Sequence, residues 1–467
     1  MSILNTILMN LPEVKGPLQK RLSFKEKLKW TGIILVAFFF LGLVPLYGLG
    51  ENSLAQFEFL SIILGASFGS LISLGIGPLV TSSIVLQLLN GSGIVDFDLT
   101  TPEGKKRFQG FQKLLSIFFI VFEAGIYVFM GGLAPSAALD PGQFRIMQLI
   151  LVGQLIVGGV FIMFMDEIVS KWGFGSGISL FIAAGVSAQI MIRAFSPLGS
   201  AGQWALGTGQ AAIGQIWVLF SSLAGQNPQG AAIAASTIFA TIFIFVVVVY
   251  VQAMKVEIPL SFGRIRGHGI RWPLNFIYTS NIPVILIAAL LANVQLWARL
   301  MGNWGYPLLG TFSGGSPATG FVLWITPQNL VQLIIQGGFS LANIGHSLVY
   351  ALFMIGGSVV FSIFWVQTAG MDAKSQAKNM ISSGLQIPGF RRDQRVLESI
   401  LNRYIMPLTI MGGAAVGFLA AGADLLGALS NGTGILLAVM IIYRLYEDIA
   451  KQHMMDMHPS LRKIMGK

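Results

Sequence analysis

The most restrictive feature of this sequence is a series of apolar stretches of about twenty residues, the length that a helix needs to cross about 30 Å of hydrocarbon. With 54% hydrophobic and only 10% charged residues, the 467-residue chain has too few charges to solvate several water-soluble domains. We therefore predict an all-α membrane protein with ten transmembrane helices. The expected spans are Trp30–Leu49, Gly75–Leu89, Leu114–Leu133, Ile146–Met165, Gly175–Ile192, Ala231–Met254, Leu274–Leu296, Leu348–Thr368, Tyr404–Ala423 and Gly434–Tyr446.

The positions of lysine and arginine predict the orientation of these spans. If the N-terminus is cytoplasmic, all but three of the 29 basic residues fall on the cytoplasmic side, the exceptions being Arg145, Arg193 and Arg299. This distribution follows the positive-inside rule, and a wrong number of spans would break it. The first thirty residues show no apolar region followed by a small-residue cleavage site, so we expect no cleaved signal peptide. The prediction is a multi-pass protein of the cell membrane with both termini in the cytoplasm.

The long external segment after the fifth span divides the chain into an N-terminal half, residues 1–200, and a C-terminal half, residues 201–467. Because each half has five spans, the second half begins on the opposite side of the membrane. Two halves of like fold would then form an inverted repeat with the working site between them. We find no residue-level similarity between the halves, so this prediction rests on topology.

One apolar segment is too short to be a span. Phe57–Ile72 is interrupted by Gly65 and Gly69 and continues directly into the span at Gly75. Irregular backbone at membrane depth is tolerated only against protein or a water-filled cavity. We therefore expect a re-entrant half-helix that enters from the outside, and an amphipathic helix at the membrane surface is the alternative.

Signatures of catalysis and cofactor binding are missing from the sequence. Cysteine is absent, and no nucleotide-binding loop or paired-histidine zinc motif is present. The four histidines, at positions 268, 346, 453 and 458, are expected in loops and tails. The glycines of Gly173–Gly177 imitate a phosphate loop only weakly, and we interpret them as sites of close helix approach. We predict that the protein is not an enzyme and has no cofactor and no bound metal.

Three polar residues lie within the expected spans: Thr81, Glu123 and Asn293. Polar groups in hydrocarbon usually face a cavity or a partner, although Glu123 could simply hold neighbouring helices together. Aliphatic residues lie beside glycines at helical spacing, as the pairs Ile76–Val80 and Ile178–Ile182. Such pairs usually belong to a core or face lipid, unless the protein is a pore.

Two expected cytoplasmic loops, residues 256–273 and 369–403, are longer than topology requires. They carry closely spaced arginines: Arg264, Arg266, Arg391, Arg392 and Arg395. A basic loop is often only a topology signal. Clustered arginines also suit phosphate recognition, so ribosomal RNA or another anionic partner is the second interpretation.

Five blocks of this sequence, in order, resemble the SecY family of protein-conducting channels, and the archaeal members most. The likeness covers essentially the whole chain. The blocks are Leu74–Thr81 with Gln87–Leu89, Gly175–Ile182, Val256–Leu260, Asn281–Leu286, and Gly432–Leu437 with Ile442–Arg444.

The resemblance implies a pore that is closed by a ring of aliphatic side chains. By motif, the ring positions are Ile76, Val80, Ile178, Ile182, Ile285 and Leu437. The half-helix near Phe57–Ser67 resembles the plug that blocks the external funnel. Thr81, Glu123 and Asn293 occupy positions that resemble a polar cluster at a lateral gate between spans two and three and spans seven and eight.

The resemblance also implies partners for the chain. In the family, the two basic loops dock the ribosome, and the matching positions are Arg264, Arg266, Arg391 and Arg392, with Lys374 and Lys378 secondary. The implied membrane partners are the SecE/gamma subunit and the Sec-beta subunit. The implied substrates are signal sequences and nascent polypeptides, with release of transmembrane segments into the surrounding lipid.

The alternatives are an ion-coupled transporter built on inverted repeats and a non-transporting membrane scaffold. A transporter should show convergent polar ligands at unwound helices near the midplane, whereas this sequence offers aliphatic residues and one central carboxylate. A scaffold would leave the half-helix and the arginine loops unexplained.

Overall fold

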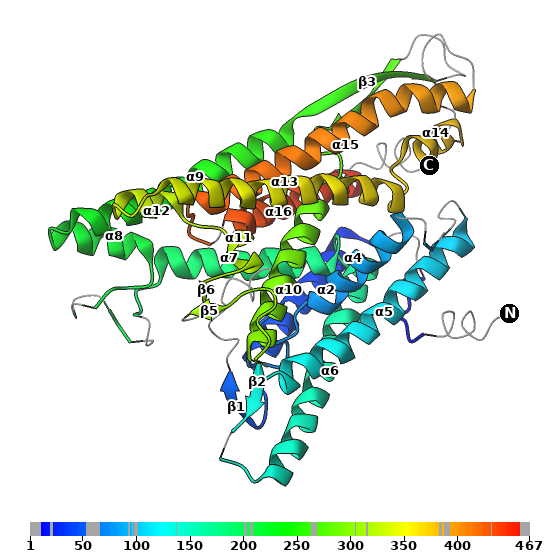
Figure 1. Ribbon diagram of the computed structural model, residues 1–467. Helices are drawn as coiled ribbons and strands as arrows, with labels where there is room; N and C mark the ends of the chain where they lie inside the picture. Colours follow the sequence, from blue (N-terminus) through cyan, green and yellow to red (C-terminus); the bar gives the residue numbers. More distant parts are fainter. Residues whose placement is uncertain are drawn as a thin grey trace.

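The computed structural model shows a predominantly helical protein (Figure 1). It describes residues 11–18, 22–52, 66–91, 94–95, 97, 101–136, 138–199, 203–205, 208, 210–262, 269–303, 305–313, 316–382, 385–386, 393–430 and 432–457. Each of the ten expected spans coincides with a helix. These helices are α2 (Phe24–Leu43), α4 (Gly77–Gly91), α5 (Pro102–Phe129), α6 (Pro141–Trp172), α7 (Gly177–Phe195), α9 (Pro228–Ala253), α10 (Ile282–Asn303), α13 (Leu341–Thr368), α15 (Gln394–Leu425) and α16 (Gly432–Met457).

Seven of these helices are long and apolar enough to cross a membrane by themselves. The others are α2, α4 and α16. Helix α4 has only 15 residues, and α2 and α16 each carry charged residues at one end, among them Lys27 and Lys29 in α2 and Arg444 and Glu447 in α16. Length and composition thus confirm a multi-pass helical membrane protein.

Short elements connect the long helices. The short helices are α8 (Gln215–Ala224), α11 (Phe321–Trp324), α12 (Leu330–Ile335) and α14 (Ala373–Ser382). The strands are β1 (Leu49–Asn52) with β2 (Leu133–Pro135), β3 (Lys255–Phe262) with β4 (Gly269–Asn275) and β7 (Leu385–Gln386), and β5 (Phe312–Ser313) with β6 (Ser316–Pro317).

The ends of the helices form two opposite faces. On one face, Gln452 of α16 donates to the carbonyl of Leu22 at 3.0 Å, and Lys255 after α9 pairs with Glu447 of α16 at 3.3 Å. We call this end, which includes α14 and the β3–β4 hairpin, the basic face. On the opposite face, β1 pairs with β2, and α8 packs on α9. In Figure 1, β3 and α14 lie far from α8, β1 and β2.

Residues 12–15 lie across the basic-face end of α6 and are hydrogen-bonded to it. The Val14 N–H donates to Glu167 at 2.9 Å, and the Trp172 indole donates to the carbonyl of Lys15 at 3.0 Å. Lys171 hydrogen-bonds Glu13, and this contact lowers the pKa of the Glu13 carboxyl. The ion pairs therefore fix the chain before its first span.

Three predicted span boundaries fall in strands rather than in helices. The third span was expected to reach Leu133, but α5 ends at Phe129 and Leu133 opens β2. The chain from Leu274 to Asn275 belongs to β4, and α10 begins only at Ile282. The apolar residues Leu274 and Ile277 are buried against protein rather than lipid, which a hydropathy pattern cannot distinguish. The first span was expected to reach Leu49, but α2 ends at Leu43 and Leu49 opens β1.

Two histidines are placed differently from the prediction, since His453 lies inside α16 rather than in a tail. His346 lies inside α13 rather than in a loop, is 7% exposed, and hydrogen-bonds the carbonyl of Leu323 through Nε2 at 2.5 Å. Helix α13 begins about two turns earlier than expected, because its first turns are polar and glycine-containing rather than uniformly apolar.

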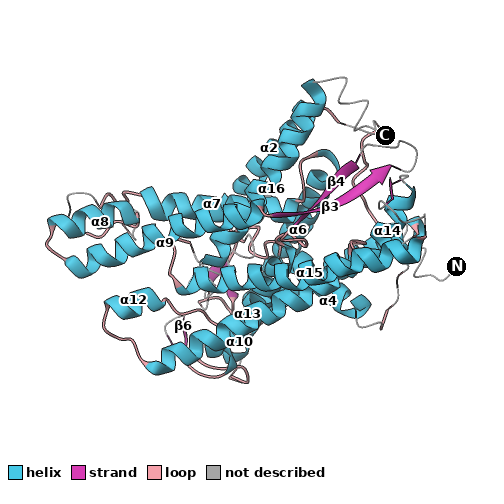
Figure 2. Cartoon of the chain, turned by 90° about the horizontal axis from the view of Figure 1, so that it is seen from above, coloured by secondary structure: helices cyan, strands magenta, loops and turns pink. Residues whose placement is uncertain are grey.

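Helix α10 is the most enclosed of the seven apolar spans. Of its apolar stretch, 72% is buried inside the protein, against 22% for α9. It contacts α4 from the first five spans and α13, α15 and α16 from the last five. Figure 2, viewed at 90° to Figure 1, shows α7 beside α16 and the β3–β4 hairpin at the same end of the molecule as α14.

Close backbone approach makes Gly158 in α6 a sensitive position. A Cβ there would lie 1.8 Å from the carbonyl oxygen of Leu71, whereas a Cβ on Gly153 of the same helix would meet nothing within 4 Å. We expect Gly158→Ala to destabilise the protein by about 1–3 kcal/mol through overpacking. Gly153→Ala should leave stability unchanged or raise it by up to about 1 kcal/mol. Thermal unfolding in mild detergent measures both, and equal midpoints for the two variants would contradict this packing.

Candidate functional site

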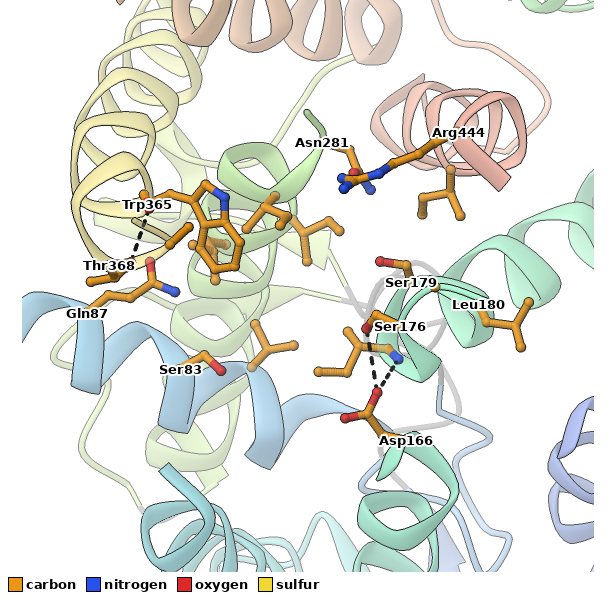
Figure 3. Close-up of a pocket in the computed structure, with 18 of the residues that line it drawn as sticks. Ser83, Gln87, Asp166, Ser176, Ser179, Leu180, Asn281, Trp365, Thr368 and Arg444 are labelled. Carbon is orange, nitrogen blue, oxygen red and sulfur yellow. Dashed lines mark hydrogen bonds between the residues drawn. The ribbon is translucent and has the colours of Figure 1, made fainter. Parts of the chain in front are cut away.

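A cavity of about 510 Å³ lies between the basic-face ends of α4, α5, α6, α7, α10, α13 and α16. Figure 3 shows Gln87, Trp365 and Thr368 on one side of this cavity and Asn281 and Arg444 on the other. Its walls come from both sets of five spans, since α4–α7 precede the long connecting segment and α10–α16 follow it. The cavity therefore lies where an inverted repeat would place its working site.

Aliphatic side chains form part of the lining of this cavity. Val80, Ile178 and Ile285 line it. All six predicted ring residues belong to one apolar cluster: Ile76, Val80, Ile178, Ile182, Ile285 and Leu437. Ile178 is half-buried and the other five are at most 5% exposed. The six residues, from the α4 region, α7, α10 and α16, therefore share one large buried cluster, and the ring itself stays a prediction.

Glycines at the start of α7 bring this helix against α6. A Cβ on Gly177 would lie 2.5 Å from the Cα of Asp166, and one on Gly173 would lie 2.8 Å from the Thr31 hydroxyl. Gly175 adopts a φ of +72°, which L side chains rarely take. The interpretation as sites of close helix approach is confirmed for Gly173 and Gly177, whereas a Cβ on Gly175 would meet nothing within 4 Å.

The three intramembrane polar residues form one hydrogen-bonded cluster. Asn293 Nδ2 of α10 donates to Thr81 Oγ1 of α4 at 3.0 Å, and Thr81 Oγ1 donates to Glu123 Oε1 of α5 at 3.1 Å. All three are buried, at 9% exposure or less. Among the described residues, Glu123 Oε2 and Asn293 Oδ1 have no hydrogen-bond partner. The cluster joins α4 to α5 and to α10, so Glu123 does hold helices together.

The two sides of α4 differ in their polar contacts. Toward α5, the Ser82 and Ser116 hydroxyls lie 2.7 Å apart, and Gln112 Nε2 donates to Ser83 at 2.7 Å. Toward α10, the polar contact seen among the described residues is the one from Asn293 to Thr81. Helix α4 is therefore tied more firmly to α5 than to α10.

The two predicted basic loops meet in one small sheet on the basic face. Its strand order is β4-β3-β7, with Phe262 paired to Leu385 and Ser261 to Gln386. Strand β3 comes from the first loop and β7 from the second. Arg264, Arg266, Arg391 and Arg392 lie outside the described residues.

Helix α14 of the second loop presents Lys374 and Lys378 to the exterior and buries Ala377 against α15. The Tyr278 hydroxyl donates to the carbonyl of Met371 at 2.7 Å, which anchors the segment before α14. Burial, reinforced by the nearby Asp372 carboxylate, raises the pKa of Tyr278 to about 12, so the hydroxyl stays protonated as a donor.

Sequence reasoning assigned no role to several residues that line the cavity, among them Gln87, Asn281 and Arg444. Each lies in one of the five blocks on which the family resemblance rests, and this is the signal that could have identified them. Gln87 and Asn281 are 3% and 2% exposed.

These features define a multi-pass helical membrane protein in which two sets of helices line one cavity, with aliphatic side chains in its wall. Comparison with known proteins supplies the family. The SecY family model matches residues 70–446, and a second model, described as the plug domain of Sec61p, matches residues 36–69. The chain belongs to the SecY family.

Full-length relatives and solved structures agree with this assignment. The protein translocase subunit SecY of Methanothermobacter thermautotrophicus is 47% identical over 98% of this chain and 97% of its own length. A solved protein-conducting channel is 42% identical and covers 99% of this chain and 100% of its own, with a TM-score of 0.83. Sec61 from a canine ribosome–channel complex is 40% identical with the same coverage and a TM-score of 0.80.

The comparisons confirm the resemblance seen in the sequence, and they give no support to the transporter and scaffold alternatives. The predicted half-helix near Phe57–Ser67 lies outside the described residues except for residues 66 and 67, and it falls within the stretch that the plug-domain model matches.

The contact between Asn293 and Thr81 should be energetically coupled. In a double-mutant cycle of Thr81→Val and Asn293→Leu, we expect a coupling of about 0.6–2 kcal/mol, the range for polar bonds across helix seams in membranes. Unfolding in detergent measures it. As a control, Thr409 is buried and bonds within its own helix, so Thr81→Val and Thr409→Val should couple by less than about 0.5 kcal/mol. A coupling energy between Thr81 and Asn293 that is no larger than the one in this control cycle would contradict the contact.

Proposed function

We propose that this chain is the central pore-forming subunit of a protein translocase, which conducts unfolded polypeptides across the membrane and releases transmembrane segments sideways into the bilayer. Membership of the SecY family gives the channel function. The observation that carries the proposed pathway is the cavity between the two sets of helices, which Val80, Ile178 and Ile285 line. An apolar constriction excludes ions by dewetting and offers no fixed ligand. It can therefore pass any sequence without binding it.

The aliphatic ring is proposed as the gate of this pore: Ile76, Val80, Ile178, Ile182, Ile285 and Leu437. The segment near Phe57–Ser67 is proposed as the plug on its external side. Neither element needs a cofactor, and we propose no enzymatic activity, so the energy for transport comes from the partners.

Lateral release requires the two halves, residues 1–200 and 201–467, to separate along one side. We place the lateral gate at the seam between α4 and α10, with Thr81, Glu123 and Asn293 as its polar cluster. The seam is supported by a single polar contact among the described residues, Asn293 to Thr81, whereas α4 is bonded repeatedly to α5. A signal helix that replaces this contact can open the seam at modest cost.

The basic face is proposed as the cytoplasmic side of the cell membrane and as the docking site for the ribosome. The β3–β7 pairing joins the two basic loops, which supports one binding surface rather than two. Its contacts to ribosomal RNA would be Arg264, Arg266, Arg391 and Arg392, with Lys374 and Lys378 beside them. We also propose the SecE/gamma and Sec-beta subunits as membrane partners.

Site-specific crosslinking to a stalled nascent chain tests the polypeptide pathway. A photoreactive residue at Ile178 or Ile285 should crosslink to the translocating chain, because both side chains line the cavity. The matched control is Phe245, an apolar residue on α9 that is 52% exposed and should face lipid. Crosslinks at Phe245 but not at Ile178 and Ile285 would contradict the pathway.

Charge reversal tests the docking surface. Arg264→Glu and Arg391→Glu should each weaken ribosome binding and lower the slope of log affinity against log salt by about one, as expected for a lost phosphate contact. Sedimentation of ribosomes with the reconstituted complex at several salt concentrations measures this. Arg145→Glu makes the same charge change at an exposed position on the opposite face and should have no effect. Equal affinity and slope in all three variants would refute docking through these loops.

A further inference from the structure

Two of the helices that carry proposed ring residues are capped by an aspartate from the preceding long helix. At the start of α7, Asp166 Oδ1 of α6 accepts the backbone N–H of Ile178 at 3.0 Å and the Ser176 hydroxyl at 3.5 Å. Figure 3 shows Asp166 directed at Ser176 beside the cavity. The N-cap residue of α7, Ser176, makes no side-chain cap bond of its own. Asp166 therefore supplies the cap that the helix itself lacks.

The start of α16 has the same arrangement. Asp424 of α15 accepts the backbone N–H of Thr433 at 2.9 Å, and it also accepts the Thr433 hydroxyl. A third donor, the Tyr350 hydroxyl of α13, bonds the same carboxylate at 2.6 Å. Asp424 is 6% exposed, so these three donors satisfy a buried charge-bearing group.

The two caps lie on opposite faces of the membrane domain. Asp166 belongs to the fourth long helix and caps the fifth at the basic face, and Asp424 belongs to the ninth and caps the tenth at the opposite face. Both capped helices begin at a glycine in close contact: a Cβ on Gly432 would lie 1.8 Å from the carbonyl carbon of Ala423. This relationship is the one that an inverted repeat requires.

A related sequence signal accompanies the caps. Gly175-Ser-Gly-Ile178 and Gly432-Thr-Gly-Ile435 have the same pattern, so the halves do share a short motif that the sequence analysis did not recognise. In this sequence match, Gly177 corresponds to Gly434. The two helices do not begin at matching residues, because α7 begins at Gly177 whereas α16 begins at Gly432, two residues before Gly434.

We propose that Asp166 and Asp424 are positioning residues that fix the height of the ring residues along the pore. This inference rests on the proposed role of the ring as the seal. Asp166 binds the backbone of Ile178, which is itself a ring position. Asp424 binds Thr433, which lies one helical turn before the ring residue Leu437 on the same face of α16.

Loss of a cap frays the first turn of a helix. The first turn of α7 contains Ile178, so fraying of this turn would displace a ring residue directly. In α16 the ring residue lies one turn further on, and the Tyr350 bond links the cap to α13. The resting seal should therefore depend on both caps, and more strongly on Asp166.

Ion conductance of the resting channel tests this inference, measured on the complete translocase in planar bilayers without substrate. We expect Asp166→Ala to raise the resting conductance by about fivefold to thirtyfold, the shift in a two-state equilibrium when a cap is lost, and Asp424→Ala to raise it less. Asp166→Asn and Asp424→Asn keep an acceptor oxygen and should remain sealed. Thr409→Ala, which removes a buried hydroxyl that bonds only within α15, should also remain sealed.

A rescue variant separates positioning from general stability. In the Asp166→Ala background, Ser176→Asp places a carboxylate at the N-cap of α7 itself and should restore the seal. Asp166→Ala alone could fail to assemble. In that case the inference is supported if the double variant assembles and seals, and it is refuted if the double variant fails to assemble or to seal. Alanine variants that seal like the parent, or asparagine variants that leak like alanine, would also overturn it.

A ring variant, Ile182→Asn, shows which proposal has failed. If Ile182→Asn leaks and the alanine cap variants do not, the ring remains the seal and only the positioning role is refuted. If Ile182→Asn does not leak, the proposed ring is refuted as well.

Discussion

The seam between α4 and α10 is the contact on which the rest of the structure depends. In a bilayer, helices gain no hydrophobic driving force by associating, so a seam is held by side-chain packing and a few polar bonds worth about 0.6–2 kcal/mol each. Between α4 and α10 the polar contact among the described residues is Asn293 to Thr81. This seam can thus be closed at rest and still be separable.

In the mechanism that we propose, the enclosed position of α10 lets one weak seam control the pore. Helix α10 carries Ile285 of the proposed ring and Asn293 of the polar cluster, two turns apart on one helix, and it is the most buried apolar span. A displacement of α10 from α4 changes the ring and the seam together. By contrast, α4 is hydrogen-bonded to α5 through Ser82–Ser116 and Gln112–Ser83, so these two helices should move as a pair.

The hydrocarbon core of a bilayer contains no water, and this constraint determines where the buried polar groups lie. Every helix end at membrane depth needs a partner for its free N–H groups. Asp166 and Asp424 provide partners at the starts of α7 and α16, two of the helices that carry proposed ring residues. Most basic residues lie at the basic face instead, where β3 and β7 join the two long loops in one sheet.

The length of the apolar stretches was enough to predict the ten long helices, because hydrocarbon thickness dictates span length. The start of α10 was misplaced because Leu274 and Ile277 are apolar but buried in protein. The residues of the polar cluster were predicted as intramembrane polar groups from their positions alone. That Thr81, Glu123 and Asn293 meet was expected only through the family resemblance, since no local pattern connects residues so far apart in the chain.

The aspartate caps show what sequence patterns could not supply. A capping residue is normally sought directly before its helix, and here Ser176 occupies that place without capping. The capping oxygen comes from Asp166, which precedes the Gly173–Gly177 turn, and only the close approach of α6 to α7 at Gly177 brings it within reach.

A covalent bridge across the seam tests the central claim most directly. The chain has no cysteine, so a Thr81→Cys/Asn293→Cys pair would be the only target in it for a cleavable bismaleimide. The control pair is Ser82→Cys/Ser116→Cys, which joins α4 to α5 within one half. If the seam must open, bridging Thr81→Cys/Asn293→Cys stops translocation in proteoliposomes, cleavage of the bridge restores it, and the bridged control pair remains active. Translocation at the unbridged rate through a channel bridged from α4 to α10 would contradict the account.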